Sequence, residues 1–313
     1  MSSQKSEKLK FLLDAVPPGF LVDGRFLRAH RFQSKSIADY VSRGWLERIG
    51  WGVYRRPLPS NLMIPDKASA SISAESSDRV SAVPWPVAVV SMQRIMGYDF
   101  HVGGVSALQL LGHVHHLPLG GDQTLHLYGE TPSWLRRISL DTQPLTHTRA
   151  LFAGDATVGV VDADRNMVTT NPDLSVWHYS VKTATPERAI LEAIDQLPSH
   201  TTFDAIDQLF QGLTMLRPKL LMQLLQACRS VKVKRLFLVF TDHHRHAWRE
   251  HLDFSRVRLG SGPRALVGGG KLHPTYRIAV AESYLPRNRL SSKLAIDAVQ
   301  LASDHKTQAV KDD

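Results

Sequence analysis

Proline and glycine residues divide the first 58 residues into short segments, and these residues limit how long each helix or strand there can be. Apolar residues recur at helical spacing between Lys5 and Val16, which predicts a first helix. Pro17-Pro18-Gly19 ends it, because proline has no amide hydrogen and disfavours helix in the preceding residue. A short second helix is expected over residues 24–30. This segment is therefore built from brief helices rather than from one long helix.

A third helix and a hairpin complete the segment. Ser36 is expected to cap the helix N-terminus, with Asp39 completing a capping box, and Gly44 is expected to end the helix. Two strands, 45–49 and 53–56, then flank a Gly-Trp-Gly turn. Three short helices followed by a tight hairpin are typical of a winged helix-turn-helix. The fold class is predicted to be α+β, with this domain followed by a larger mixed α/β domain.

Positive charge is concentrated in the same segment. The whole sequence has a net charge of +9, and residues 1–58 carry +6 of it, from eleven Lys and Arg residues against five acidic ones. The other 255 residues share the remaining +3. A basic winged helix favours a polyanionic partner, and double-stranded DNA is the expected one. The alternative is a solvated basic surface on a winged helix that binds protein.

The recognition helix of such a domain needs hydrogen-bonding side chains on its first turns, where they can reach base edges in the major groove. Ser34, Lys35, Ser36 and Tyr40 occupy those positions. Arginines before the helix, at its end and on the hairpin suit phosphate contacts, which orient the domain without reading sequence. These are Arg25, Arg28, Arg31, Arg43, Arg48, Arg55 and Arg56.

Three further regions are expected after the winged helix. Residues 59–83 are serine-rich and are expected to form a linker, residues 84–285 the large domain, and residues 286–313 a polar, frayed tail. Within the large domain, helices are expected at 87–96, 105–111, 185–197, 202–212, 217–228 and 244–253. Strands are expected at 124–128, 157–161, 256–259 and 276–280.

The sequence contains no run of eighteen apolar residues and no apolar signal segment near Met1, so a cytoplasmic protein without membrane contact is expected. Cys228 is the single cysteine, and it lies in an apolar helical stripe where packing is the expected role. Lys232, Lys234 and Arg235 form a basic group outside the winged helix. They could extend a nucleic-acid surface, meet an acidic partner, or form the solvated face of a helix.

Several residue groups are candidate sites of chemistry, but none of them forms a recognised catalytic set. Histidines cluster at 101–147 and 243–251, but structural zinc sites usually add cysteines. Aspartates at 155–164 lack the Glu-x-Lys partner typical of a nuclease. Glycine-rich segments at 260–263 and 268–271 lack the Walker and dinucleotide patterns. Neither a cofactor, a metal site nor an enzymatic activity is therefore expected.

The segment from Ser36 to Pro57 resembles the N-terminal winged-helix domain of AbiEi-type antitoxins from bacterial type IV toxin–antitoxin systems. Its marks are a helix ending in Arg-Gly-x-Leu and a hairpin ending in Gly-Val-Tyr. Later segments come in the family's order, and the resemblance covers about residues 5–285. These later segments are His101–Gly112, Leu125–Tyr128 with Pro132–Leu135, and Thr185–Glu192.

The resemblance implies a two-part role. The winged helix would bind inverted repeats in the operon's own promoter and repress it, and the larger domain would counteract a nucleotidyltransferase toxin encoded beside it. It adds Trp51, on the wing, to the DNA-binding residues, and it brings no catalytic motif. The rival hypotheses are a winged-helix nuclease or metal-dependent hydrolase that uses the aspartate or histidine clusters, and a transcription factor whose second domain binds a small ligand.

Overall fold

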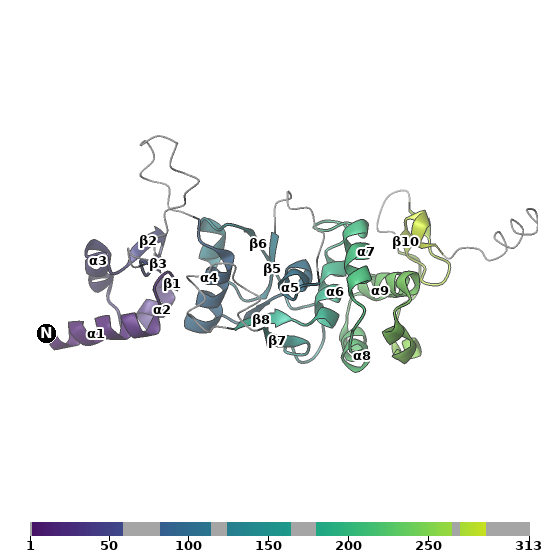
Figure 1. Cartoon of the computed structure of the whole chain (residues 1–313), viewed down its shortest axis with the longest axis horizontal. Coiled ribbons are helices and arrows are strands. Elements are labelled where there is room, and N and C mark those ends of the chain that lie inside the picture. The colour runs from purple at the N-terminus through teal and green to yellow at the C-terminus, as the bar shows by residue number, and fades with distance from the viewer. Residues whose placement is uncertain (1, 59–81, 114–123, 164–179, 265–269, 286–313) are drawn as a thin grey trace, which may run out of the picture.

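The chain is extended along one axis in the computed structural model (Figure 1). A small winged unit lies at one end, a mixed sheet in the middle and a group of helices at the other end. The structure describes residues 2–58, 82–113, 124–163, 180–264 and 270–285. Almost all of the predicted linker and the whole predicted tail lie outside these ranges. Among the described helices, none is long and apolar enough to cross a membrane.

The first 58 residues form the winged helix-turn-helix that the sequence predicts. Its elements are α1 (Ser2–Ala15), β1 (Leu21–Asp23), α2 (Gly24–Ala29), α3 (Ser34–Ser42), β2 (Glu47–Gly50) and β3 (Val53–Arg55). The three strands form an antiparallel sheet of order β1-β3-β2. The sequence pattern does not predict β1, because three residues are too few to show an alternation.

α3 begins three residues earlier than the sequence predicts. Its N-cap is Gln33, whose side chain makes no capping bond, so the prediction of Ser36 as the N-cap is wrong. Asp39 accepts a hydrogen bond from Arg43 Nε at 2.8 Å, one turn later, and does not close a capping box. The predicted end of the helix is confirmed by Gly44, whose φ of +72° is a conformation that glycine adopts readily.

The middle of the chain is a five-stranded mixed sheet with short helices. Its elements are α4 (Trp85–Val90), continued by a π-helical turn (Ser91–Ile95), β4 (Phe100–Val102), α5 (Gly104–Leu110), β5 (Thr124–Gly129), β6 (Gln143–His147), β7 (Val160–Ala163) and β8 (Val181–Ala184). The strand order is β6-β5-β4-β8-β7, with β6–β5 and β4–β8 parallel and the other two pairs antiparallel. The sequence predicts α4, α5 and β5 closely, but misses β4, β6 and β8.

The last part of the described chain is mostly helical. Its elements are α6 (Pro186–Asp195), α7 (Phe203–Gly212), α8 (Pro218–Ala227), α9 (Val231–His244), β9 (Lys271–Leu272) and β10 (Ala279–Val280). The predictions of α6, α7 and α8 are confirmed. A helix at 244–253 and a strand at 256–259 are wrong, because this stretch holds only short 3-10 turns at Ala247–His251 and Phe254–Arg256.

The sequence pattern does not predict α9, because Lys232, Lys234 and Arg235 interrupt its apolar residues. Lys234 and Arg235 are 6% and 2% exposed, so this basic group is not a surface. The guanidinium of Arg235 is surrounded by backbone carbonyl oxygens at 2.7–3.1 Å, and Lys232 Nζ also donates to backbone carbonyls. The carbonyls around Arg235 are those of Leu259, Gly260, Gly262 and Arg277. Buried cations here organise loops that lie far away in the sequence.

Two hydrophobic cores follow one another along the molecule. The first joins the winged helix to the sheet and includes Leu12 and Val53 together with Phe100 and Leu127, all fully buried. The second packs α5 against the helices from α6 to α9. The winged helix therefore shares apolar packing with the sheet, and the domain boundaries at residues 58 and 84 stay predictions.

Candidate nucleic-acid interface

The first turn of α3 faces solvent. Ser34 and Lys35 are exposed and Ser36 is half-buried. Lys35 has no carboxylate partner among the described residues. Side chains on the first turns of such a helix are the ones that reach base edges in the major groove. These three residues therefore form the part of the surface that is suited to read sequence.

The wing is the hairpin of β2 and β3, and its tip carries an aromatic side chain. Trp51, in the turn, is 81% exposed. Gly52 follows it with a φ of +69°, which lets the turn close tightly. Arg48 on β2 is exposed, and its guanidinium carbon lies 5.9 Å from the ring centroid of Tyr54. An exposed cation and a flat ring on the wing are suited to contact the sugar–phosphate backbone.

Three arginines lie between the start of α2 and the loop before α3. Arg25, Arg28 and Arg31 are all exposed, and within the described ranges none of them forms an ion pair with a carboxylate. The guanidinium of Arg25 lies 5.1 Å from the ring centroid of Tyr98. Lys8 Nζ donates to the carbonyl of Arg31 at 2.8 Å, which brings a further cation to this side. The guanidinium groups of Arg28 and Arg31 are therefore available for the predicted phosphate contacts, whereas that of Arg25 also contacts Tyr98.

Tyr40 and Arg56, both predicted to contact DNA, point into the winged helix. Tyr40 is 4% exposed, and burial, with nearby Asp39, raises the pKa of its phenol. Arg56 Nη1 donates to the carbonyls of Leu13 and Val16 at 2.6 and 2.7 Å, and burial lowers the pKa of the guanidinium. Neither placement supplies a side-chain surface for DNA. The spacing of Tyr40 three residues after buried Ile37 was the signal that it faces inward.

Arg43 and Arg55 are intermediate cases, because each has an acidic partner. Arg43 pairs with Asp39 at 2.8 Å, but its side chain is 63% exposed. Two N–H groups of Arg55 donate to Glu47 Oε2 at 3.0 and 2.8 Å, and its side chain is only 18% exposed. A surface pair like the first contributes little to stability, so a phosphate could replace Asp39. DNA contacts of all twelve residues stay predictions.

Asp23 links the winged helix to the rest of the molecule through hydrogen bonds to Tyr98 and Trp134. The sequence pattern does not predict this role. Asp23 Oδ1 accepts from the amide of Phe26 at 2.8 Å, which caps α2. Its Oδ2 accepts from Tyr98 Oη at 2.6 Å and from Trp134 Nε1 at 2.9 Å. The capping position was readable from the sequence, but partners 75 and 111 residues away were not. These buried bonds therefore join the winged helix, at the start of α2, to the domain that contains the five-stranded sheet.

A buried ion cluster joins the sheet to α6. Glu192 Oε1 contacts Arg188 Nε at 2.8 Å and His101 Nε2 at 2.9 Å, and its Oε2 accepts from the amide of Gly104 at 3.1 Å. Burial opposes ionisation of Glu192, but His101 and Arg188 outweigh it and lower the pKa of the carboxyl. All three side chains are 1% exposed. The cluster is closed to solvent and holds elements together.

A cavity of about 540 Å³ opens beside this cluster, with His147, Asp195 and Arg229 among its lining residues. The ring of His147 stacks on those of His126 and Tyr128, with centroids 5.2 and 4.5 Å apart. Burial, with the imidazoles of His147 and His200 nearby, lowers the pKa of His126 to about 4. Burial also lowers the pKa of His147, so His126 and His147 are both neutral at neutral pH.

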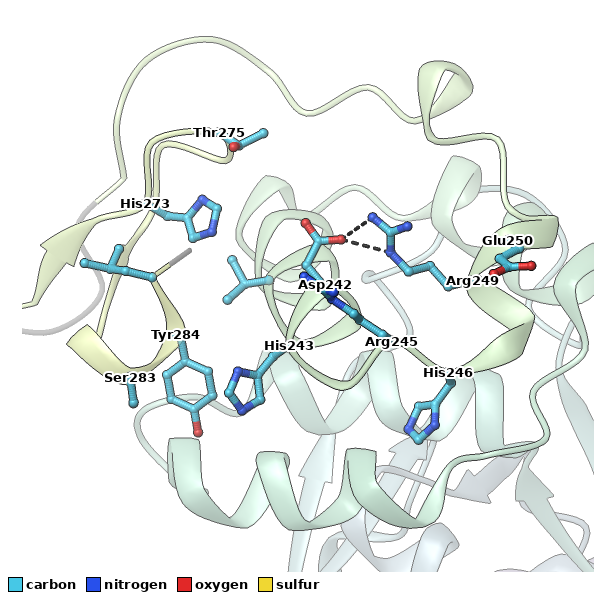
Figure 2. A pocket seen from close by; sticks show the side chains of 12 residues that line it. Asp242, His243, Arg245, His246, Arg249, Glu250, His273, Thr275, Ser283 and Tyr284 are labelled. Atoms are coloured by element: carbon cyan, nitrogen blue, oxygen red, sulfur yellow. Dashed lines mark hydrogen bonds and ion pairs between the residues drawn. The ribbon is translucent and has the colours of Figure 1, made fainter. Parts of the chain in front are cut away.

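A larger cavity of about 890 Å³ lies at the helical end (Figure 2). Asp242 accepts hydrogen bonds from Arg249 Nε at 2.9 Å and from Tyr276 Oη at 2.5 Å. His243 and His273 also line it. Burial and the Asp242 carboxylate raise the pKa of Tyr276. The lining mixes both signs of charge, and Asp242 is already occupied by its two donors.

The residues weighed as a nuclease centre do not come together in the described structure. Asp155 Oδ1 accepts hydrogen bonds within its own turn, and Asp162 pairs with Arg94. Asp164 lies outside the described residues. Cys228 is buried, and burial raises the pKa of its thiol to about 11, which disfavours the reactive thiolate.

A winged helix with an exposed recognition helix and unpaired cations is the architecture of a DNA-binding regulator. The family model described as the AbiEi antitoxin transcriptional regulator of type IV toxin–antitoxin systems matches residues 122–281, and the model of the AbiEi antitoxin N-terminal domain matches residues 5–119. The chain belongs to this AbiEi antitoxin family. It is thus a transcriptional regulator and an antitoxin rather than an enzyme, and the resemblance that the sequence shows is confirmed.

One solved structure is similar along most of the chain. The crystal structure of the RV2827C protein from Mycobacterium tuberculosis aligns with 88% of this chain and 90% of its own, at 16% sequence identity and a TM-score of 0.49. Among curated proteins, none matches this sequence.

Proposed function

We propose that the winged helix represses the promoter of its own operon by binding inverted repeats there, and that the rest of the chain neutralises a nucleotidyltransferase toxin encoded beside it. The observation that carries the repressor half is the exposed start of α3, with unpaired Lys35, next to a wing that presents Arg48 and Trp51. A transcriptional regulator binds DNA and an antitoxin has a cognate toxin, so the family supports the coarser part of this proposal.

The surface proposed to meet DNA, called the recognition face below, consists of the exposed members of the predicted set together with half-buried Ser36. Side chains on the first turn of α3 would enter the major groove, while cations around it and on the wing would contact phosphates. The recognition face comprises Arg25, Arg28, Arg31, Ser34, Lys35, Ser36, Arg43, Arg48 and Trp51. It supports a division of labour in which residues 1–58 bind cytoplasmic promoter DNA and residues 84–285 oppose the toxin.

A gel-shift assay with the DNA upstream of the operon tests the repressor half. Wild-type protein should bind this DNA in preference to unrelated DNA of equal length at moderate salt. The double variant Lys35→Ala/Arg48→Ala should lose that binding, because both cations lie in the recognition face without carboxylate partners. Lys219→Ala, exposed on α8, is the matched control and should bind normally. Equal binding of upstream and unrelated DNA by the wild type would overturn the repressor half.

Co-expression with the neighbouring toxin tests the antitoxin half. Wild-type protein should restore growth, and the Lys35→Ala/Arg48→Ala variant should restore it equally while a promoter reporter becomes derepressed. That pattern would separate neutralisation from DNA binding. Failure of the wild type to restore growth would exclude the proposed antitoxin action on that toxin, whatever the outcome of the DNA experiments.

A further inference from the structure

Three side chains that can ligate a metal converge where α7 lies beside the end of α9. Asp207 comes from α7, and His243 and His244 are the last residues of α9. One ligand atom from each lies within 4.8 Å of the other two. Asp207 Oδ1 is 2.7 Å from His244 Nε2 and 4.0 Å from His243 Nε2. The histidine cluster was visible in the sequence, but the carboxylate 36 residues before it was not.

These distances are close to those of a coordinated metal. Zinc binds imidazole nitrogen and carboxylate oxygen at about 2.0–2.2 Å, and in a tetrahedral site that places neighbouring ligand atoms roughly 3.4 Å apart. The separations of 2.7 and 4.0 Å lie on either side of this value. The ligand atoms of the two histidines also lie within 4.8 Å of each other, so a side-chain movement on the order of 1 Å would bring all three groups around one ion.

The surroundings leave one side of the group open. The side chains of Asp207 and His244 are 19% and 10% exposed, whereas that of His243 is 41% exposed. His243 lines the large cavity, where it lies next to Tyr284, with ring centroids 5.1 Å apart (Figure 2). Asp207 and His244 would bind the ion on the covered side, and solvent would reach it on the side of His243. Such an open site keeps a position for water or for a group from a partner.

We propose that Asp207, His243 and His244 form a binding site for a divalent transition metal, with Zn²⁺ as the best fit. Two imidazoles and one carboxylate suit Zn²⁺, Co²⁺ or Ni²⁺, whereas Mg²⁺ and Ca²⁺ take all-oxygen ligand sets. The bound ion would tie α7 to α9 and so stabilise the helical end. In the alternative role, without a metal, Asp207 accepts hydrogen bonds from His244 and Tyr284. His243 then packs against the ring of Tyr284.

Calorimetric titration of the full chain tests this site. Untagged protein, freed of metal with a chelator and desalted, should bind one equivalent of Zn²⁺ and no Mg²⁺. His243→Ala should weaken binding by about 10–100-fold or more, since losing even an outer partner of a metal ligand costs that much. His251→Ala removes an exposed histidine from the same segment but not from the group, and it should bind like the wild type. Equal Zn²⁺ affinity of wild type and His243→Ala would overturn the proposal.

Thermal unfolding gives a second readout. Zn²⁺ should raise the unfolding midpoint of the wild type, because a ligand that binds only the folded state stabilises it, and should not raise that of Asp207→Asn. If Asp207→Asn does not fold, the visible spectrum of Co²⁺-loaded protein decides instead. The wild type should show the absorption of a nitrogen- and oxygen-ligated ion, and His243→Ala should lose it. Unchanged spectra in the two proteins would sink the site.

Discussion

At the winged-helix end (residues 2–58), Arg28, Lys35 and Arg48 face solvent with no carboxylate partner in the described chain, whereas at the helical end (residues 186–285) Arg188 and Arg235 are 1% and 2% exposed. Within the described chain, Arg48 of the first group contacts the ring of Tyr54, and none of the three side chains donates a hydrogen bond. The second group donates hydrogen bonds to carbonyl oxygens from distant loops. The same residue types are thus exposed, and available to an outside partner, at one end, and stabilise the fold itself at the other.

This difference teaches that charge alone does not locate an interface. Counting residues places most of the net charge on the first 58, and exposure then shows which of those cations are available. At the helical end, a buried guanidinium is tolerated because its N–H groups donate several hydrogen bonds. Removing a cation should therefore damage folding at one end and binding at the other, and four experiments test that separation.

The largest effect is expected from Arg188→Ala. Arg188 donates to Glu192 and to the carbonyls of Ala156 and Val158 at 2.7–2.8 Å, so its loss leaves a buried carboxylate and two carbonyls short of partners. The free energy of unfolding in urea should fall by about 3–5 kcal/mol. Arg229→Ala, which removes an exposed arginine, should change it by less than about 0.5 kcal/mol. Equal losses in both variants would contradict the comparison.

The pH dependence of stability tests the buried histidine His126 on β5 of the central sheet. The folded pKa of His126 is about 4 against 6.5 in the unfolded chain, because burial opposes its charged form. The unfolded chain therefore binds more protons between these values, so the stabilisation is complete above pH 6.5 and is lost as the pH falls towards 4. This loss should reach about 3 kcal/mol. His126→Gln should show a correspondingly flatter curve from pH 6.5 to 4, and an unchanged slope would refute the assignment.

Asp23→Ala tests the joint between the two regions. It removes the cap of α2 and leaves the buried donors of Tyr98 and Trp134 unpaired, which should cost about 2–3 kcal/mol of unfolding free energy. Tyr98→Phe removes one of these bonds and should cost about 1 kcal/mol. Hydrogen exchange should show faster opening of α2 in Asp23→Ala. If the two variants lose the same stability, the other two bonds of Asp23 contribute nothing.

The smallest effects on folding are expected on the recognition face, where only DNA binding should change. Wild-type binding by about six phosphate contacts predicts a slope near −5 in a plot of log affinity against log salt. Lys35→Ala and Arg48→Ala should leave the unfolding free energy within about 0.5 kcal/mol of wild type. Fluorescence anisotropy across a salt series should show the slope of Arg48→Ala reduced by about 0.9. A stability loss comparable to that of Arg188→Ala would erase the distinction between the two ends.

Local signals in the sequence were enough for much of the winged helix. Pro17, Gly44 and the Gly-Trp-Gly turn punctuate it, so its helices and hairpin follow from backbone chemistry. The exposed members of the recognition face could be predicted from their positions on these helices and on the hairpin. The inward orientation of Tyr40 was also readable from helical spacing, since it shares a face with buried Ile37.

The rest depended on pairings between distant segments. β4, β6 and β8 are three to five residues long and gain their partners from across the sheet, which single-sequence patterns do not contain. α9 carries Lys232, Lys234 and Arg235, whose charges suggested a surface until the carbonyls of distant loops were in place around Arg235. Asp207 reaches the histidines of α9 only through helix packing.

The buried link at Asp23 has a consequence for the spacing of DNA sites. Because this link and the shared apolar core hold the winged helix against the sheet, two copies joined through any surface outside the winged helix would hold their α3 helices at one set separation and angle. Paired major grooves on one face of B-DNA recur only about every 34–36 Å. Parts of the protein that do not contact DNA would then determine the distance between operator half-sites. Inserting half a helical turn between the repeats would leave the second copy facing the wrong side of the duplex.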